Sequence, residues 1–196
     1  MTVNHNDHYH RFLLRKVPPR CRRALDVGCG SGTFARLLAR RAEAVDAIDR
    51  SAEMIAAARA RNTDRITYRV ADVQEIELTP GGYDYISCIA AIHHMPFAPT
   101  IGRLRAALAP GGVLAVLGLS RPTWTDLAVA SVGFVPDQVR KLAGRRRGVP
   151  AEPPPPIMDP DLTLAEIRAQ ARDLLPGAVI RRHVYWRYSM VYRLSA

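Results

Sequence analysis

Short apolar runs alternate with longer amphipathic stretches along the first 120 residues of the chain. The short runs predict strands at 24–27, 44–48, 66–70, 85–90 and 113–119. The stretches between them predict helices, with Ser31 and Ser51 as the N-cap residues of the first two and a further helix over 100–108. Strands that are separated by helical crossovers form a parallel sheet covered by helices, so the pattern predicts an α/β fold.

The alternation changes after Leu119. Residues 125–142 predict one or two amphipathic helices, and the four prolines at 153–156 exclude helix and central strand there. Thr163, with Glu166 three residues later, has the spacing of a capping box and predicts a helix to about Leu175. Two alternating runs, 179–185 and 188–194, then follow each other so closely that they must pair antiparallel.

The charge of the chain is a clue with two interpretations. Lys and Arg total 28 against 18 Asp and Glu, which gives a net charge of +10 and would suit nucleic acid or an acidic membrane. All the cations except Lys16 and Lys141 are arginines, however, and this bias, with many alanines and prolines, is also typical of a GC-rich genome. We expect a globular protein because 48% of the residues are hydrophobic and 23% are charged.

Cysteine usage and hydropathy bear on the location of the protein. The three cysteines, Cys21, Cys29 and Cys88, are an odd number without a Cys-x-x-Cys pair, which indicates neither a disulfide framework nor a zinc ribbon. The chain begins without the apolar stretch of a signal peptide and has no run of membrane-spanning length. The sequence therefore predicts a cytoplasmic protein without stable membrane insertion.

The most informative segment is Asp26-Val27-Gly28-Cys29-Gly30-Ser31-Gly32-Thr33, which lies between a predicted strand and a predicted helix. Glycines at alternate positions let the backbone turn sharply and approach a ligand, and the helix behind them offers free N–H groups. Asp49 ends the next strand, at the distance where a carboxylate binds ribose hydroxyls. The sequence thus predicts a cofactor that contains a nucleoside.

The Gly-x-Gly-x-Gly spacing after an acidic residue resembles that of class I S-adenosylmethionine-dependent methyltransferases, especially the small-molecule enzymes related to ubiquinone and menaquinone methyltransferases. The resemblance covers roughly residues 23–119. It implies a Rossmann-like, doubly wound sheet of seven strands, mostly parallel with an antiparallel last strand and helices on both faces. It also implies S-adenosyl-L-methionine as the cofactor. We expect no metal, because the acid cluster that metal-assisted methyltransferases place after the fourth strand is missing here, where His93 is followed by His94-Met95-Pro96-Phe97.

The same resemblance assigns cofactor contacts to individual positions. Asp26 and the backbone of Gly28, Cys29 and Gly30 would hold the methionine moiety, Asp49 the ribose, Arg50 and Met54 the faces of the adenine, and Asp72 with Val73 its amino edge, while Ile89 and Ala90 would lie nearest the reactive methyl group. Met54 also suits a plain core position. We expect Cys29 to be a small residue that is tolerated in the loop, with no nucleophilic role.

His93 and His94 directly follow the fourth predicted strand, at the edge where open α/β sheets bind ligands. Histidine suits proton transfer near neutral pH, and similar methyltransferases carry a His-His element here, so His94 is the first candidate for a catalytic base and His93 the second. The alternative is that one histidine packs against the cofactor and the other caps a turn.

The N-terminal segment would fold over the site in similar enzymes, where Tyr9, with His5 or His8, would touch the cofactor or the acceptor; a solvated tail is the alternative. We expect a single domain with an N-terminal lid over 1–22, a cofactor-binding core over 23–119, an insertion or substrate lid over 120–160, and a closing helix and hairpin over 161–196. Trp124 and Phe134 are candidates for an apolar substrate wall, whereas Tyr185, Trp186, Tyr188 and Tyr192 are expected to pack in the core or at the sheet edge.

The leading hypothesis is methyl transfer to oxygen, nitrogen or carbon of a small, apolar or aromatic molecule by a monomer or homodimer. A second hypothesis makes RNA or another macromolecule the substrate, with Arg140, Arg145, Arg146 and Arg147 as the phosphate contacts. A third places the amphipathic segment 125–147 on a membrane surface, and a fourth is a cofactor-binding protein without catalysis.

Overall fold

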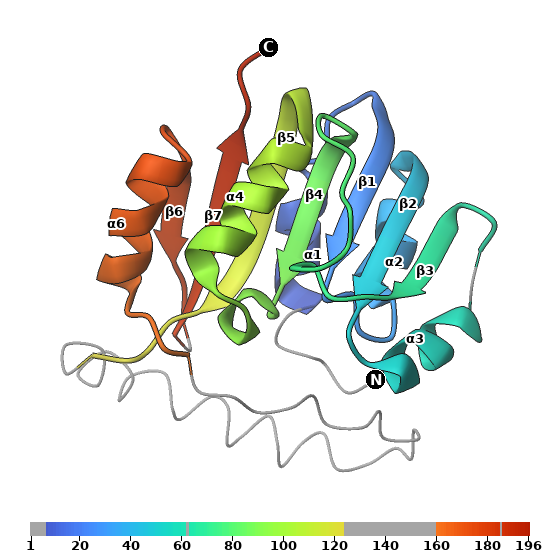
Figure 1. Cartoon of the computed structure of the whole chain (residues 1–196), viewed down its shortest axis with the longest axis horizontal. Coiled ribbons are helices and arrows are strands. Elements are labelled where there is room, and N and C mark those ends of the chain that lie inside the picture. Colours follow the sequence, from blue (N-terminus) through green and yellow to red (C-terminus); the bar gives the residue numbers. More distant parts are fainter. Residues whose placement is uncertain (1–6, 62, 124–159, 185) are drawn as a thin grey trace.

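Seven strands form one mixed sheet in the order β3-β2-β1-β4-β5-β7-β6 (Figure 1). The computed structural model describes residues 7–61, 63–123, 160–184 and 186–196. The strands are β1 (Cys21–Val27), β2 (Ala42–Asp49), β3 (Ile66–Val70), β4 (Tyr83–Ile89), β5 (Leu108–Leu119), β6 (Val179–Arg182) and β7 (Arg187–Arg193). The first five run parallel, whereas β7 is antiparallel to both of its neighbours. The predicted fold class and the predicted terminal hairpin are thus confirmed.

Helices cover both faces of the sheet. The helices α1 (Asp7–Leu14), α2 (Thr33–Leu38) and α3 (Ala52–Arg59) pack on one face, and α4 (Phe97–Ala107) and α6 (Leu164–Leu174) pack on the other. Leu13, Phe34 and Ile55 anchor the first layer, and Ile101 and Ile167 the second. Because both faces are buried, the central strands are apolar at almost every position.

Two of the three predicted caps are confirmed. The Ser51 side chain accepts a hydrogen bond from the backbone N–H of Met54, and Thr163 forms a full capping box with Glu166. The prediction for Ser31 is wrong, because the N-cap of α2 is Gly32, in a left-handed conformation with φ 76°. Gly32 is required there because a Cβ atom would overlap the hydroxyl of Tyr68 beneath the loop.

Several elements begin earlier than the sequence predicted, and the largest differences are in β1, β5 and α4. β1 begins at Cys21 and β5 at Leu108, where its pairing with β4 shifts register before the regular ladder begins. Helix α4 begins at Phe97 rather than at Thr100. Pro99 falls in its first turn, where the missing N–H of proline removes no intrahelical hydrogen bond.

The strand order reverses direction between β1 and β4, which are neighbours in the middle of the sheet. In doubly wound folds, ligands bind outside the carboxyl ends of the strands at this point. The carboxyl ends of the parallel strands lie along the lower edge of the sheet in Figure 1. None of the helices in the described part of the chain combines the length and apolar content needed to span a membrane.

Candidate functional site

The glycine-rich loop after β1 is held against the neighbouring strand β2. The backbone N–H groups of Gly28 and Cys29 both donate to the carbonyl oxygen of Ile48, at 2.9 and 3.0 Å. Gly28 and Gly30 have φ values of 68° and 52°, which only glycine adopts without strain. A Cβ atom on Gly28 would overlap the methyl group of Ala91, whereas a Cβ on Gly30 would have no described atom within 4 Å. Gly28 therefore allows close packing, and Gly30 faces open space where a ligand fits.

Asp49, at the end of β2, braces this loop. One carboxylate oxygen accepts from the N–H of Gly30 at 2.8 Å, and the other accepts from the N–H of Ser51 at 2.9 Å. Because each carboxylate oxygen can accept two hydrogen bonds, Asp49 keeps acceptor capacity for a ligand. The structure thus brings Asp49 next to the glycine loop.

Asp26, at the end of β1, is a buried carboxyl group with an unmatched oxygen. Its side chain is almost fully buried, and Oδ1 accepts a hydrogen bond from the Ser87 hydroxyl at 2.8 Å. Oδ2 has no partner in the described structure. Burial raises the pKa of Asp26 to about 7, the Ser87 hydrogen bond opposes this rise, and the charge of Asp49 adds to it. An ammonium group that reached Oδ2 would satisfy the orphaned acceptor and favour the ionised form.

Cys29 lies between the two loop glycines and is buried. Burial and the nearby charges of Asp26 and Asp49 raise the pKa of its thiol well above the ordinary value. The sulfur is therefore a thiol at neutral pH, which agrees with its expected role as a small loop residue.

The residues expected around the adenine divide into a charged pair and two apolar side chains. Asp72 accepts from the N–H of Gln74 at 2.8 Å, and its other oxygen lies 3.4 Å from Nε of Arg50. Met54 is half-buried at the start of α3, while Val73 is buried in the core of the opposite face. The structure thus pairs Asp72 with Arg50 and leaves Val73 little surface for a ligand.

Strand β4 ends in a strained turn. Ala90 has a φ of 52°, which is unusual for a residue with a side chain, and its N–H donates to the carbonyl oxygen of Leu117 at 2.7 Å. Ile89 and Ala90 are both half-buried at this edge. The turn leads into η1 (Ile92–His94), so both candidate histidines lie in one short 3₁₀ helix.

The two histidine rings lie in contact, tilted by 41° with their centroids 4.0 Å apart, but they have different neighbours. Nδ1 of His93 is buried without a partner in the described structure, and burial, then His94 and Arg187, lower the pKa of His93 to about 4. The pKa of His94 is lowered by burial and by the charge of Arg50. Because only His93 lines the cavity beside this turn, the histidine ranked second by sequence is the one that faces a ligand space.

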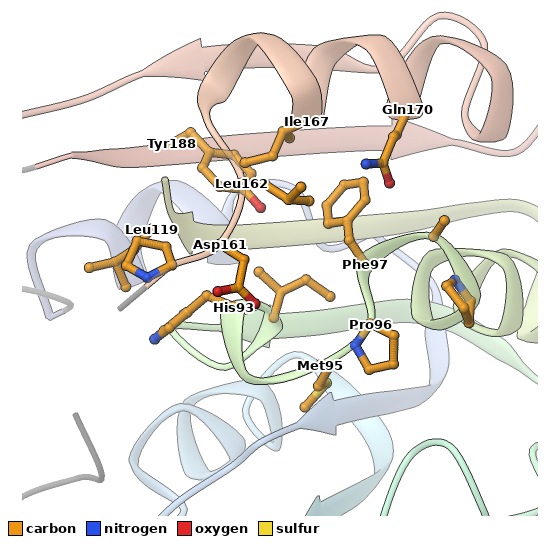
Figure 2. A pocket seen from close by; sticks show the side chains of 14 residues that line it. His93, Met95, Pro96, Phe97, Leu119, Asp161, Leu162, Ile167, Gln170 and Tyr188 are labelled. Carbon is orange, nitrogen blue, oxygen red and sulfur yellow. The ribbon is translucent and has the colours of Figure 1, made fainter. Parts of the chain in front are cut away.

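That cavity lies beside the carboxyl edge of the sheet, between η1 and α4 on one side and α6 and β7 on the other (Figure 2). It has a volume of about 310 Å³, and its polar lining side chains are His93, Asp161 and Gln170. The other eleven lining side chains are aliphatic or aromatic: Ile92, Met95, Pro96, Phe97, Ala98, Pro99, Leu119, Pro160, Leu162, Ile167 and Tyr188. In the described part of the chain, no group of three or more metal-ligating side chains is found.

Several of these lining residues carried no signal in the sequence. Tyr188 was expected to pack in the core, and it is buried, but its side chain also lines the cavity. Ile167 and Gln170 belong to α6, whose amphipathic pattern predicted the helix but not the wall it forms. Only the packing of α6 beside α4 brings these side chains to the cavity.

The N-terminal candidate Tyr9 lies on helix α1. Its ring is 4.8 Å from the ring of His183, in the turn between β6 and β7, and the helix is fixed to the sheet by the Tyr85 hydroxyl, which donates to the carbonyl oxygen of Leu13. Tyr9 does not line the cavity. The other candidates of the N-terminus and the insertion lie outside the described residues: His5, the side chain of His8, Trp124, Phe134, Arg140, Arg145, Arg146 and Arg147.

Comparisons with known proteins agree with this geometry. The methyltransferase-domain family matches residues 24–112. An uncharacterized methyltransferase from Mycobacterium tuberculosis is 35% identical over 97% of this chain and 96% of its own length. A ubiquinone biosynthesis O-methyltransferase from Xanthomonas campestris is 36% identical over 58% of this chain, which corresponds to 50% of that protein. The crystal structure of an S-adenosylmethionine-dependent methyltransferase from Mesorhizobium loti superposes with a TM-score of 0.65 at 19% identity, over 95% of this chain and 96% of that one.

The edge of the sheet also fits S-adenosylmethionine in its own chemistry. This cofactor carries an ammonium group, ribose hydroxyls and an adenine amino group, all of which donate hydrogen bonds. The site offers the unpaired oxygen of Asp26, the carboxylates of Asp49 and Asp72, and open space at Gly30. The chain belongs to the class I S-adenosylmethionine-dependent methyltransferases, and S-adenosylmethionine is its cofactor.

Proposed function

We propose that the protein transfers a methyl group from S-adenosylmethionine to an oxygen, nitrogen or carbon atom of a small apolar or aromatic metabolite bound in the cavity of Figure 2. The cavity is the observation that carries this proposal. Its volume of about 310 Å³ falls in the range of small-molecule sites, and its lining is mostly apolar with a few polar side chains. Such a lining favours acceptors with a flat or aliphatic body and one or two polar groups.

The carboxylates at the strand ends would hold the cofactor. Asp26 Oδ2, which lacks a partner, would accept from the ammonium group of the methionine moiety, and Asp49 would accept from the ribose hydroxyls with its remaining lone pairs. Asp72 would bind the adenine amino group. Arg50, which now contacts Asp72, would either move away from it or keep this contact while its side chain lies against the face of the adenine. When bound, S-adenosylmethionine supplies a methyl group on a positively charged sulfur that reacts directly with a nucleophile.

His93 is the residue that we propose as the base. Its lowered pKa of about 4 keeps the imidazole neutral at physiological pH, so an unprotonated ring nitrogen can accept the proton of an acceptor hydroxyl or amine. A weak base is sufficient because an oxygen or nitrogen that gains a methyl group becomes much more acidic. His94 lies near Arg50 and does not line the cavity, so it would pack on the side of the turn that faces the cofactor.

A small acceptor is favoured over a macromolecule. The cavity is lined by side chains of η1, α4, β5, α6, β7 and the loops beside them, and those described side chains include no arginine or lysine. RNA binding through Arg140 to Arg147 rests on charge alone, since these residues lie outside the described structure. The intact set of loop glycines and carboxylates favours an enzyme over a cofactor-binding protein without catalysis.

The proposal is tested by filling the cavity. Ala98→Phe places a ring in the cavity from α4, whereas Ala106→Phe makes the same change at an exposed position of the same helix. Both variants should bind S-adenosylhomocysteine like the wild type. Against a panel of phenols, catechols and aromatic amines, with S-adenosylhomocysteine release measured by chromatography, Ala98→Phe should lose at least about tenfold in kcat/KM and Ala106→Phe should not.

Two results would contradict the proposal. If the wild type methylates no member of the panel, the acceptor class is wrong. If Ala98→Phe keeps the wild-type turnover of an accepted substrate, as the control Ala106→Phe should, the acceptor binds elsewhere.

A further inference from the structure

A second hollow lies at the opposite edge of the sheet, where the parallel strands begin. Its volume is about 490 Å³, and it is lined by Pro19, Arg20, Cys21, Arg22, Arg40, Arg41, Ala42, Glu43 and Arg65. Five of the lining residues are arginines and one is an acid. We call this site the basic hollow.

Three separate segments bring these arginines together. Arg20 and Arg22 flank the first residue of β1, Arg40 and Arg41 precede β2, and Arg65 precedes β3. The strands are in register, with Cys21 opposite Ala42 and Val45 opposite Ile66, so their amino ends meet at one edge. The clustering is therefore a result of the fold and not of a charged run in the sequence.

Most of these arginines have no ion-pair partner among the described residues. Arg20, Arg40, Arg41 and Arg65 are exposed and form no ion pair with the described residues. Arg22 is 79% exposed, and its Nε lies 4.0 Å from the carboxylate of Asp84. Nearby arginines one step further into the sheet behave differently, because Arg23 and Arg69 are matched by the buried Asp46, at 2.7 and 3.4 Å.

Helix stability explains only part of the cluster. Arg40 and Arg41 follow the C-terminal end of α2, where a positive charge interacts favourably with the helix dipole. Arg20 and Arg22 precede and begin a strand, and no helix end is there to neutralise them. Close guanidinium groups repel one another, and a bound multivalent anion would remove that repulsion.

The lining also restricts the kind of anion. The described side chains of the basic hollow include no aromatic ring, so a nucleic acid base has no surface on which to stack. Its apolar side chains are only Pro19, Cys21 and Ala42, which leaves charge and guanidinium hydrogen bonds as the source of affinity. The planar guanidinium group matches the geometry of phosphate oxygens.

We propose that the basic hollow binds a compact multivalent phosphate, of the triphosphate type, at a site separate from the cofactor site. The ligand would be free polyphosphate or the phosphate chain of a nucleotide. It would not compete with the cofactor, because the basic hollow lies at the amino ends of the strands and the glycine loop at their carboxyl ends.

Isothermal titration of the full chain with inorganic triphosphate in metal-free, low-salt buffer tests this proposal. We compare the wild type with Arg20→Gln/Arg65→Gln and with the control Arg168→Gln/Arg172→Gln, which removes the same charge from exposed positions of α6. The first variant should bind triphosphate at least about tenfold more weakly, and the control should bind within about twofold of the wild type. Circular dichroism and unchanged affinity for S-adenosylhomocysteine show that each variant is folded.

Further arms identify the source of the phosphate. Tighter binding of ATP than of triphosphate indicates a nucleotide, and equal binding indicates that only the phosphates are recognised. The proposal is overturned if triphosphate does not bind, if both double variants lose affinity equally, or if saturating S-adenosylhomocysteine displaces it. It is also overturned if oligouridine binds and triphosphate does not, because the hollow would then contact RNA.

Discussion

Four buried polar side-chain atoms have no partner in the described structure, and two of them, Oδ2 of Asp26 and Nδ1 of His93, belong to residues of the proposed site. A buried acceptor without a hydrogen bond costs about 1–3 kcal/mol of stability. A ligand that donates to these atoms recovers that free energy on binding. At the scale of single residues, a role in ligand binding therefore explains these two unpaired atoms better than a role in the stability of the fold.

Ser87 should tune the affinity of Asp26 for the cofactor. The Ser87 hydroxyl lowers the pKa of Asp26, which burial has raised to about 7, so Ser87→Ala should raise that pKa further. A cationic ammonium group binds the ionised carboxylate, so cofactor affinity should increase with pH through about 7 in the wild type. In Ser87→Ala, affinity at pH 7 should fall about tenfold and recover partly at pH 8.5.

Calorimetric titration of S-adenosylhomocysteine at pH 6.5, 7.5 and 8.5 measures both effects. Thr67→Ala, at an exposed position of β3, is the matched loss of a hydroxyl. A Ser87→Ala protein with the wild-type pH profile would rule out this role for Asp26.

The two histidines should differ in their effect on turnover. His93→Gln should lower kcat by about 100-fold or more if His93 is the base, while His94→Gln should change kcat much less. Since protonation of His93 is expected only near pH 4, wild-type kcat should be level between pH 6 and 8 and should fall below about pH 5. The measurement is kcat against pH with an acceptor found in the panel. A larger effect of His94→Gln on kcat would restore the order that the sequence suggested.

At the scale of elements, the glycine loop and the η1 turn are fitted to each other by one contact. Gly28 has a φ of 68°, and the methyl group of Ala91 occupies the place of its absent side chain. Gly28→Ala should therefore destabilise the protein by about 1–3 kcal/mol through strain and overlap. The double variant Gly28→Ala/Ala91→Gly should recover the part due to overlap but not the part due to φ.

Urea denaturation, with S-adenosylhomocysteine affinity as a second readout, separates these two parts. Gly102→Ala, in α4 with open space around its Cβ position, is the control. Equal stability of the single and double variants would show that the Ala91 contact is unimportant.

How far the sequence predicts each element depends on whether local or distant residues decide it. The strands and the terminal hairpin were predictable because buried runs and the short connection between 179–185 and 188–194 are local signals. The N-cap of α2 was not, because Tyr68 on β3 requires glycine at position 32. In the same way, the spacing of the glycine motif was enough to predict Asp26 and Asp49 as site residues. The position of Tyr188 and Ile167 in the cavity was not predictable, because it depends on how α6 and β7 pack.

At the scale of the whole molecule, the sheet separates two edges of different chemistry. Carboxylates and open glycine backbone gather where the parallel strands end, and arginines, most of them without an ion-pair partner among the described residues, gather where they begin. The net charge of +10 was an ambiguous clue in the sequence. In the fold, part of the positive charge is concentrated in the basic hollow, and no run of charged residues in the sequence predicted this cluster.

Cofactor binding should stabilise the entire domain, because the proposed contacts lie at or after the ends of β1, β2, β3 and β4. At a concentration 100 times Kd, S-adenosylhomocysteine should add about 2.7 kcal/mol to the free energy of unfolding. For a chain of this size, this corresponds to a rise in Tm of about 5–10 °C. Thermal unfolding with and without ligand measures the shift. Asp49→Ala should lose most of it, and Glu53→Gln, an exposed charge on α3, should keep it.

The contact between Gly28 and Ala91 also limits how this enzyme can be recombined with its relatives. The described residues that line the proposed acceptor cavity all lie at or after Ile92, so a chimera would exchange them as one block. A junction placed before Ala91 would import a residue that is not matched to the loop on the cofactor side. A junction at Ile92 keeps the matched pair together, and it is therefore the natural boundary for transplanting a new acceptor site onto this cofactor-binding half.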